Sequence, residues 1–113
     1  MRLNQDGARS SGMVLHKSKV TQTKLAIAAT LALTDDFPTA MDIDPATTSQ
    51  KILMPAPTIA NEGLYFYINN LGTGAGTLVL RDSGDTVTYA TLPISKLSMV
   101  VNLNGTWRAM VSA

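Results

Sequence analysis

The chain of 113 residues has no cysteine, few aromatic residues and little charge. The absence of cysteine excludes disulfides, thiol nucleophiles and zinc–thiolate sites, and it leaves the redox compartment open. Aromatic residues make up 5% and charged residues 15% of the chain, whereas hydrophobic residues make up 45%. The core must therefore be small and mainly aliphatic, under a surface rich in Thr, Ser, Asn and Gly. This composition is typical of a β-rich structural protein and unusual for a cytosolic enzyme.

Long apolar runs are missing as well. The first 20 residues are polar, and no apolar run approaches the roughly 18 residues that a membrane span needs. We therefore expect neither a secretory signal nor a membrane segment, and we expect a soluble protein. The length fits a single domain.

Charge is divided unevenly along the chain. Residues 1–24 hold five basic residues and one acid, whereas the remainder holds four basic residues and seven acids. The first segment also has few large apolar side chains, so alone it would not offset the entropy of becoming ordered. We therefore expect a basic N-terminal arm over 1–24 and a β-domain over 25–113. The arm can be a strap ordered on an acidic partner, a flexible tail or a nucleic-acid tether; the low Arg density and the lack of interleaved aromatics count against the tether.

Apolar side chains alternate with a period of two from residue 25 onward, which predicts strands. In 25–33 the larger side chains fall on odd positions, so this segment is expected to form one strand. Pro38 and Pro45 bracket a short strand around Met41 and Ile43, and the Pro-Ala-Pro of 55–57 ends the next one.

Turn residues organise the second half of the chain. "GLYFYINN" predicts a half-buried strand, and Asp82-Ser83-Gly84-Asp85 predicts a hairpin turn whose acids accept hydrogen bonds from nearby backbone N–H groups. Asn104-Gly105 predicts a closing hairpin, in which Trp107 returns across from the strand 97–103 and acts as a structural anchor. About eight short strands and no helix predict an antiparallel β-sandwich that is jelly-roll-like.

Several patterns suggest chemistry but do not meet its requirements. A dinucleotide site needs a third glycine three residues after the second and a helix that follows, and a Walker loop needs Gly-Lys-Ser/Thr. The segment "LGTGAGT" meets neither requirement. His16 has no second His or Cys for a metal site, and Asp42-x-Asp44 does not follow a calcium loop. No Gly-x-Ser-x-Gly elbow accompanies the Ser, His and Asp residues. We therefore expect no enzymatic activity, no cofactor and no metal.

The order of the segments resembles a β-domain of tailed-phage virion proteins. The resemblance covers residues 31–111 and rests on "LALT", "ATTSQKILMPAP", a Gly-led strand, "GTGAGTLVL" and the final "NGTW" hairpin. Such domains occur in head decoration (cement) proteins and in tail-fibre or spike proteins. The chain is the domain plus one arm, and this favours the decoration protein, because a fibre protein embeds the domain in a long chain.

The resemblance implies a non-enzymatic protein that binds the outer surface of the capsid and bridges capsid subunits. Its expected partners are the major capsid protein and itself, as a homodimer or homotrimer, and neither nucleic acid nor a membrane is expected. Tyr65 and Tyr67 are candidates for a subunit–subunit surface. The alternative is a tail-fibre or spike module that binds a receptor or glycan. The candidate capsid contacts all lie in the arm: Arg2, Arg9, Met13, Val14, Leu15, Lys17, Lys19, Val20 and Lys24.

Overall fold

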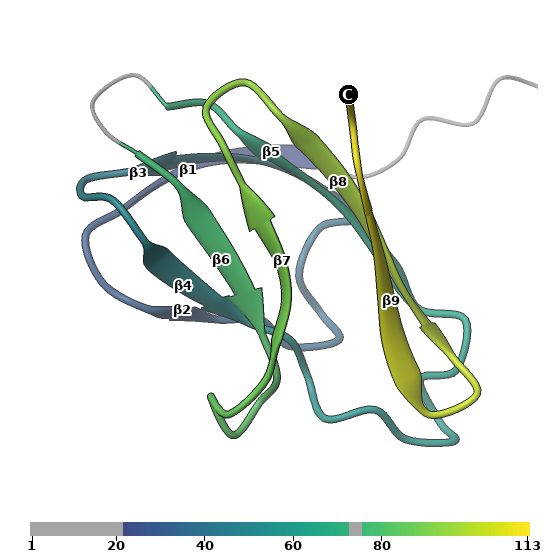
Figure 1. The fold of residues 1–113 in the computed structure, drawn as a ribbon. Coiled ribbons are helices and arrows are strands. Elements are labelled where there is room, and N and C mark those ends of the chain that lie inside the picture. Colours follow the sequence, from purple (N-terminus) through teal and green to yellow (C-terminus); the bar gives the residue numbers. More distant parts are fainter. Residues whose placement is uncertain (1–21, 73–75) are drawn as a thin grey trace, which may run out of the picture.

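The computed structural model describes residues 22–72 and 76–113, which form strands and connecting turns, with no helix among them. Nine strands make two sheets, ordered β1-β3-β5-β8-β9 and β2-β4-β6-β7 (Figure 1). The strands are β1 Gln22–Ile27, β2 Leu31–Ala32, β3 Ala40–Pro45, β4 Gln50–Leu53, β5 Tyr65–Asn70, β6 Leu78–Arg81, β7 Thr88–Leu92, β8 Leu97–Leu103 and β9 Thr106–Val111. The predicted all-β class is confirmed.

The sheets are mixed, so the expectation of purely antiparallel pairing was wrong. β1, β3 and β5 pair in parallel in the larger sheet, as do β2, β4 and β6 in the smaller one. The physical reason is the path of the chain, which passes to the other sheet after each of β1 to β5, so alternate strands run the same way. Only the pairs β5–β8, β6–β7 and β8–β9 are antiparallel.

The N-terminal boundary and the first strand also differ from expectation. β1 begins at Gln22, so the last three residues of the expected arm pair with β3. The segment 25–33 is interrupted at 28–30, and β2 belongs to the other sheet. Alternation alone could not reveal this break, because the small residues Ala28 and Ala29 suit a strand and a turn equally.

A single core of buried apolar side chains joins the two sheets. The larger sheet contributes residues such as Ile43, Phe66 and Val100, and the smaller sheet contributes residues such as Ile52 and Leu80, all fully buried. These positions alternate along their strands, as the period-two pattern requires. The sheets therefore share one hydrophobic interior.

The closing hairpin forms as predicted from Asn104-Gly105. Both residues have positive φ values, 54° and 81°, as a two-residue hairpin turn of type I′ requires. Trp107 is only 2% exposed; its ring lies 6.1 Å from that of Phe66, and its Nε1–H donates to the Pro55 carbonyl at 2.7 Å. The indole thus ties the hairpin to the loop that precedes β5.

Buried amides make a second set of contacts inside the fold. Asn70 of β5 donates through Nδ2 to the Leu92 carbonyl of β7 at 2.9 Å, which links the two sheets. Asn102 of β8 donates through Nδ2 to Asn61 Oδ1 at 2.6 Å, which fixes the loop before β5. Because a buried amide must find partners, these contacts specify how the loop and the sheets fit together.

Candidate functional site: an apolar outer face

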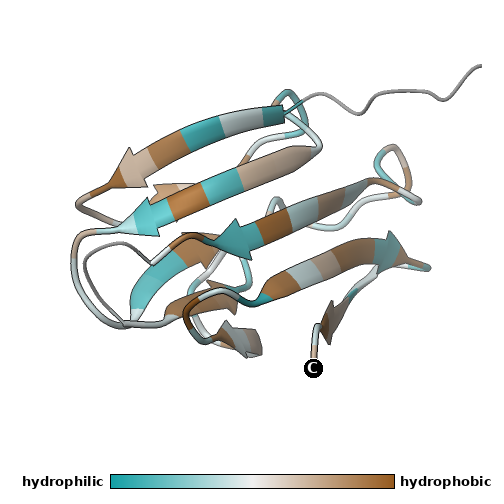
Figure 2. Ribbon diagram, turned by 90° about the horizontal axis from the view of Figure 1, so that it is seen from above, coloured by the Kyte–Doolittle hydropathy of each residue, from teal (hydrophilic) through white to brown (hydrophobic). Residues whose placement is uncertain are grey.

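The outer surface of the larger sheet is apolar over three adjacent strands. β5, β8 and β9 lie side by side at one edge of this sheet, and the hydrophobic colour runs along most of β8 in Figure 2. The side chains that point away from the core on these strands are mostly large and nonpolar. We call this set the apolar face: Tyr65, Tyr67, Leu97, Met99, Val101, Leu103 and Met110.

Exposure of these side chains is high for their type. Met110 is 65% exposed, Leu103 52%, Leu97 42% and Tyr65 40%. Large apolar residues scattered singly over a surface need no explanation, but a contiguous set marks an interaction surface. The apolar face is therefore the strongest candidate for a functional surface.

The face arises from an inverted pattern on β8. Its inward residues are Ser98, Val100 and Asn102, all fully buried, so two of the three core positions are polar. The other four apolar residues of the same strand point outward. A strand that needed only to complete the core would place its apolar row inward.

Strand pairing places the outward side chains in rows across the face. One row is Tyr65, Val101 and Arg108, on β5, β8 and β9 in that order. The next row contains Tyr67, Met99 and Met110 in the same order. A third contains Asn69, Leu97 and Ser112, with Ser112 held by a 2.8 Å backbone hydrogen bond to Leu97.

Shallow hollows interrupt the apolar face. One of about 200 Å³ lies between Tyr67, Leu97, Met99 and Met110. A second of about 230 Å³ lies over Met99, Val101, Leu103 and Met110. Both are open and lined almost entirely by nonpolar atoms, so they suit protruding apolar side chains of a partner rather than a polar substrate.

The outer surface of the same sheet is polar toward its opposite edge, where β1 and β3 lie. Lys24, Asp42 and Asn69 share one row across β1, β3 and β5. Asn69 donates through Nδ2 to Asp42 Oδ1 at 2.9 Å. Asp42 and Asp44 lie on the outer face of β3 and are not joined by other acids in a metal-binding group within 22–72 and 76–113.

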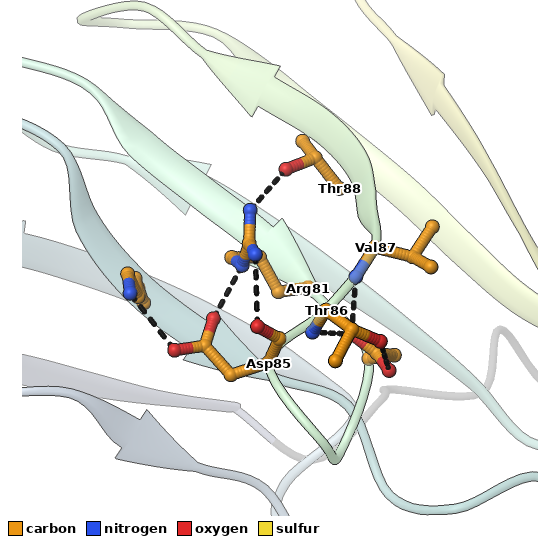
Figure 3. A network of polar contacts seen from close by, with 7 residues as sticks. Arg81, Asp85, Thr86, Val87 and Thr88 are labelled. Atoms are coloured by element: carbon orange, nitrogen blue, oxygen red, sulfur yellow. Dashed lines mark hydrogen bonds and ion pairs between the residues drawn. The ribbon is translucent and has the colours of Figure 1, made fainter.

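The outward side chains of the smaller sheet are mixed, with Lys51 and Arg81 beside Leu53 and Val79, and the sheet ends in the β6–β7 turn shown in Figure 3. Asp85 accepts hydrogen bonds from Lys51 at 2.8 Å and from Arg81 Nε, so it joins β4 to β6. The Lys51 hydrogen bond is the main reason that the pKa of Asp85 lies below its ordinary value. These contacts hold the turn and leave no unengaged acid–base pair there.

Asp82 stabilises the same turn by accepting hydrogen bonds from its backbone. Its Oδ1 accepts hydrogen bonds at 2.6 Å from the backbone N–H groups of Thr86 and Val87, as the sequence analysis predicted for this turn. The Val87 N–H is the largest cause, and the Thr86 hydroxyl the next, of a pKa lowered to about 2. The Asp82 carboxylate thus serves to hold the β6–β7 turn.

In the glycine-rich connection between β5 and β6, the structure explains the glycines at positions 72 and 76. A Cβ at Gly76 would lie 2.1 Å from Thr48 Oγ1 and 2.7 Å from Thr48 Cα, so only glycine fits there. Gly72 adopts a φ of 60°. Across the described strands and turns, no helix is long and apolar enough to cross a membrane.

Most of the predicted capsid contacts lie outside the described residues: Arg2, Arg9, Met13, Val14, Leu15, Lys17, Lys19 and Val20. His16 and the centre of the glycine-rich segment lie outside them as well. Lys24 lies exposed on β1, and Trp107 lies in the core. Tyr65 and Tyr67, the expected subunit surface, both belong to the apolar face, whose β8 and β9 residues the sequence analysis did not select.

Comparison with known proteins adds no relative: no protein-family model, no curated protein and no solved structure matches this chain.

Proposed function

We propose that this chain is a non-enzymatic structural protein of a tailed-phage virion, which binds the outside of the capsid and stabilises it by bridging capsid subunits. Its partners would be the major capsid protein and further copies of itself, as a homodimer or homotrimer. The observation that carries the proposal is the apolar face, because such a surface serves association between proteins and offers no convergent polar groups for catalysis.

The fold supports this role in a second way. We take the two sheets, which share one core, as the layers of a β-sandwich. We do not include jelly-roll connectivity, because four of the strand pairings are parallel. A two-layer body that has an apolar face on one sheet, and that follows a basic segment in the chain, can contact two neighbours at once.

The test is binding to purified phage heads that lack this protein, before and after expansion. We expect the full chain to bind expanded heads and to raise the temperature at which they open. A variant that begins at Gln22 keeps β1 intact and should bind expanded heads at least about tenfold more weakly, because multivalent contacts are lost. The variant Lys17→Gln/Lys19→Gln, which keeps the full length, separates the effect of charge from that of length.

Two results would count against the proposal. No binding of the full chain to either kind of head would overturn the capsid role, and equal affinity of the full and shortened chains would remove the strap. Binding to a glycan array by the body alone, without capsid binding, would favour the receptor-binding alternative, for which exposed Tyr65 would be the first candidate contact.

A further inference from the structure

We propose that the apolar face binds a second copy of this chain, face to face, about a two-fold axis that runs along β8. The inference deepens the proposed function, on which it rests for the expectation of self-association, by assigning the dimer, its surface and its symmetry. It also names the residue pairs that should meet.

Pairing of β8 with both neighbours supplies the geometry. β5 lies on one side of β8 and β9 lies on the other, and each row of side chains crosses all three strands. A two-fold axis along β8 exchanges the two sides without moving a residue along the strand direction. It therefore lays β9 of one copy over β5 of the other, row upon row.

Each row then brings together side chains that attract one another. Arg108 of one copy lies over Tyr65 of the second copy, because both occupy the row of Val101. A guanidinium over a tyrosine ring makes a cation–π contact. Met110 lies over Tyr67 of the second copy in the row of Met99, and a thioether beside an aromatic ring is also favourable. The symmetry forms both contacts twice.

On the axis itself, the outward residues of β8 meet their own copies. Leu97, Met99, Val101 and Leu103 are apolar, so this contact requires no charge or hydrogen-bond matching. No acidic side chain points outward from β5, β8 or β9, so Arg108 meets no opposite charge on its own strands. Aligned packing of two sheets at about 10 Å suits such a pair of faces.

The chemistry of the face favours a second copy over other occupants. A glycan needs several convergent polar groups, whereas the polar groups of this surface, the two tyrosine hydroxyls and the Arg108 guanidinium, lie among large apolar side chains. A different protein would need a complementary surface, and here the same chain supplies it: rings on β5 match the cation and the thioether on β9. An isologous contact of this kind also closes after two copies.

The first experiment measures the mass of the full chain in solution against concentration by analytical ultracentrifugation. We expect a monomer–dimer equilibrium that Met99→Lys weakens at least about tenfold, because the two-fold axis brings the two introduced like charges together in the middle row of the contact. Arg108→Glu should weaken it as well. Val79→Lys, which changes an outward residue of β6 on the smaller sheet, is the matched control and should leave the equilibrium unchanged.

A second experiment tests the symmetry by cross-linking. Because the chain has no cysteine of its own, only the introduced thiols can react. Asn69 and Ser112 share the row of Leu97, on β5 and on the β9 side. A mixture of Asn69→Cys and Ser112→Cys proteins should cross-link fastest with a short thiol-reactive linker. Either variant alone should react more slowly, and a mixture of Asn69→Cys with Lys24→Cys should be slowest, because β1 lies far from the axis.

The outcomes separate this inference from the proposed function. A monomer at every concentration, a trimer, or equal cross-linking in both mixtures would overturn the two-fold face-to-face dimer. If such a chain still bound expanded heads, the capsid role would stand without the dimer, and a monomer would remove self-association from the proposed function. A dimer that cross-links as expected but binds no capsid would overturn the capsid role alone.

Discussion

The two sheets of this protein differ in how they meet solvent. On the smaller sheet, the outward side chains are partly charged, and Lys51, Arg81 and Asp85 form ion pairs across β4, β6 and the turn after β6. On the larger sheet, the outward side of β5, β8 and β9 consists mostly of aliphatic, thioether and tyrosine side chains, with Arg108 as the one charged member. The outer surface of the smaller sheet thus suits contact with water, whereas the outer surface of β5, β8 and β9 suits contact with a partner.

The difference cannot come from a need to fill the core. β8 places Ser98 and Asn102 inward and four of its five apolar residues outward, although the opposite arrangement would bury more apolar surface. The inward Asn102 holds the loop through its hydrogen bond to Asn61, whereas Leu97 and Leu103 of the outward row remain exposed. An exposed apolar row of this kind is typical of a surface that associates with a partner.

The largest test of this comparison sets the inner face of β9 against its outer face. Trp107→Ala should lower the free energy of unfolding by about 3–5 kcal/mol, because it empties a buried site next to Phe66. Met110→Ala, three residues along the same strand, should change it by less than about 0.5 kcal/mol in the monomer. Urea unfolding at low protein concentration measures both. Similar losses would mean that Met110 supports the fold and that the outer face is not free for a partner.

A second test concerns the glycine-rich connection that leads into the smaller sheet. Gly76→Ala should cost about 1–3 kcal/mol of unfolding free energy, because the new methyl group meets the Thr48 backbone as well as its side chain. Gly84→Ala is the matched control, since the nearest atom to its Cβ is Asp82 Oδ2 at 3.5 Å. Urea unfolding compares the two variants. An unchanged stability of Gly76→Ala would contradict the close approach and reopen the question of what this segment binds.

Methionine oxidation reports directly on which face is covered. Among the methionines of residues 22–72 and 76–113, we expect Met110, 65% exposed, to oxidise fastest under dilute hydrogen peroxide, whereas Met41 and Met54, 3% and 1% exposed, should resist. Peptide mass spectrometry gives the rate at each position. If a second copy covers the apolar face, the Met110 rate should fall several-fold as protein concentration rises, while the buried pair stays slow. A rate independent of concentration would mean that the face stays open in solution.

Local rules predicted much of this fold from the sequence. Asn104-Gly105 and the 82–85 turn each specify a hairpin through their own backbone and side-chain preferences, and both hairpins form. The strands around Ile43 and Phe66 follow directly from alternation, because each has one row of large apolar residues. These features depend on neighbours in the sequence, which pattern analysis can see.

Contacts between distant segments were beyond such rules. The parallel pairing of β1 with β3 depends on the chain crossing to the other sheet at 28–30, and no local signal there marks a crossing. The apolar face was only partly found, through Tyr65 and Tyr67. On β8 the alternation is clear, but the rule that apolar residues point inward selects the wrong row. The buried amide of Asn102 decides the orientation, and its partner Asn61 lies 41 positions earlier in the chain.

The smallest expected effect concerns pH. A fall in pH should weaken the β6–β7 turn of the smaller sheet but leave the apolar face unaffected. Asp82 has a pKa of about 2 in the folded protein, below the value of about 3.9 for an unfolded chain. Its stabilising contribution is therefore fully present above about pH 4 and is lost as the pH falls toward about 2. Asp82→Asn should lower the melting temperature at pH 7 and flatten its fall between these limits, although Asp85 retains part of that fall. No acidic side chain of β5, β8 or β9 lies in the proposed dimer contact, so its dissociation constant should stay the same from pH 7 to pH 5. A marked change there would place an acidic side chain in the contact and contradict the arrangement about β8.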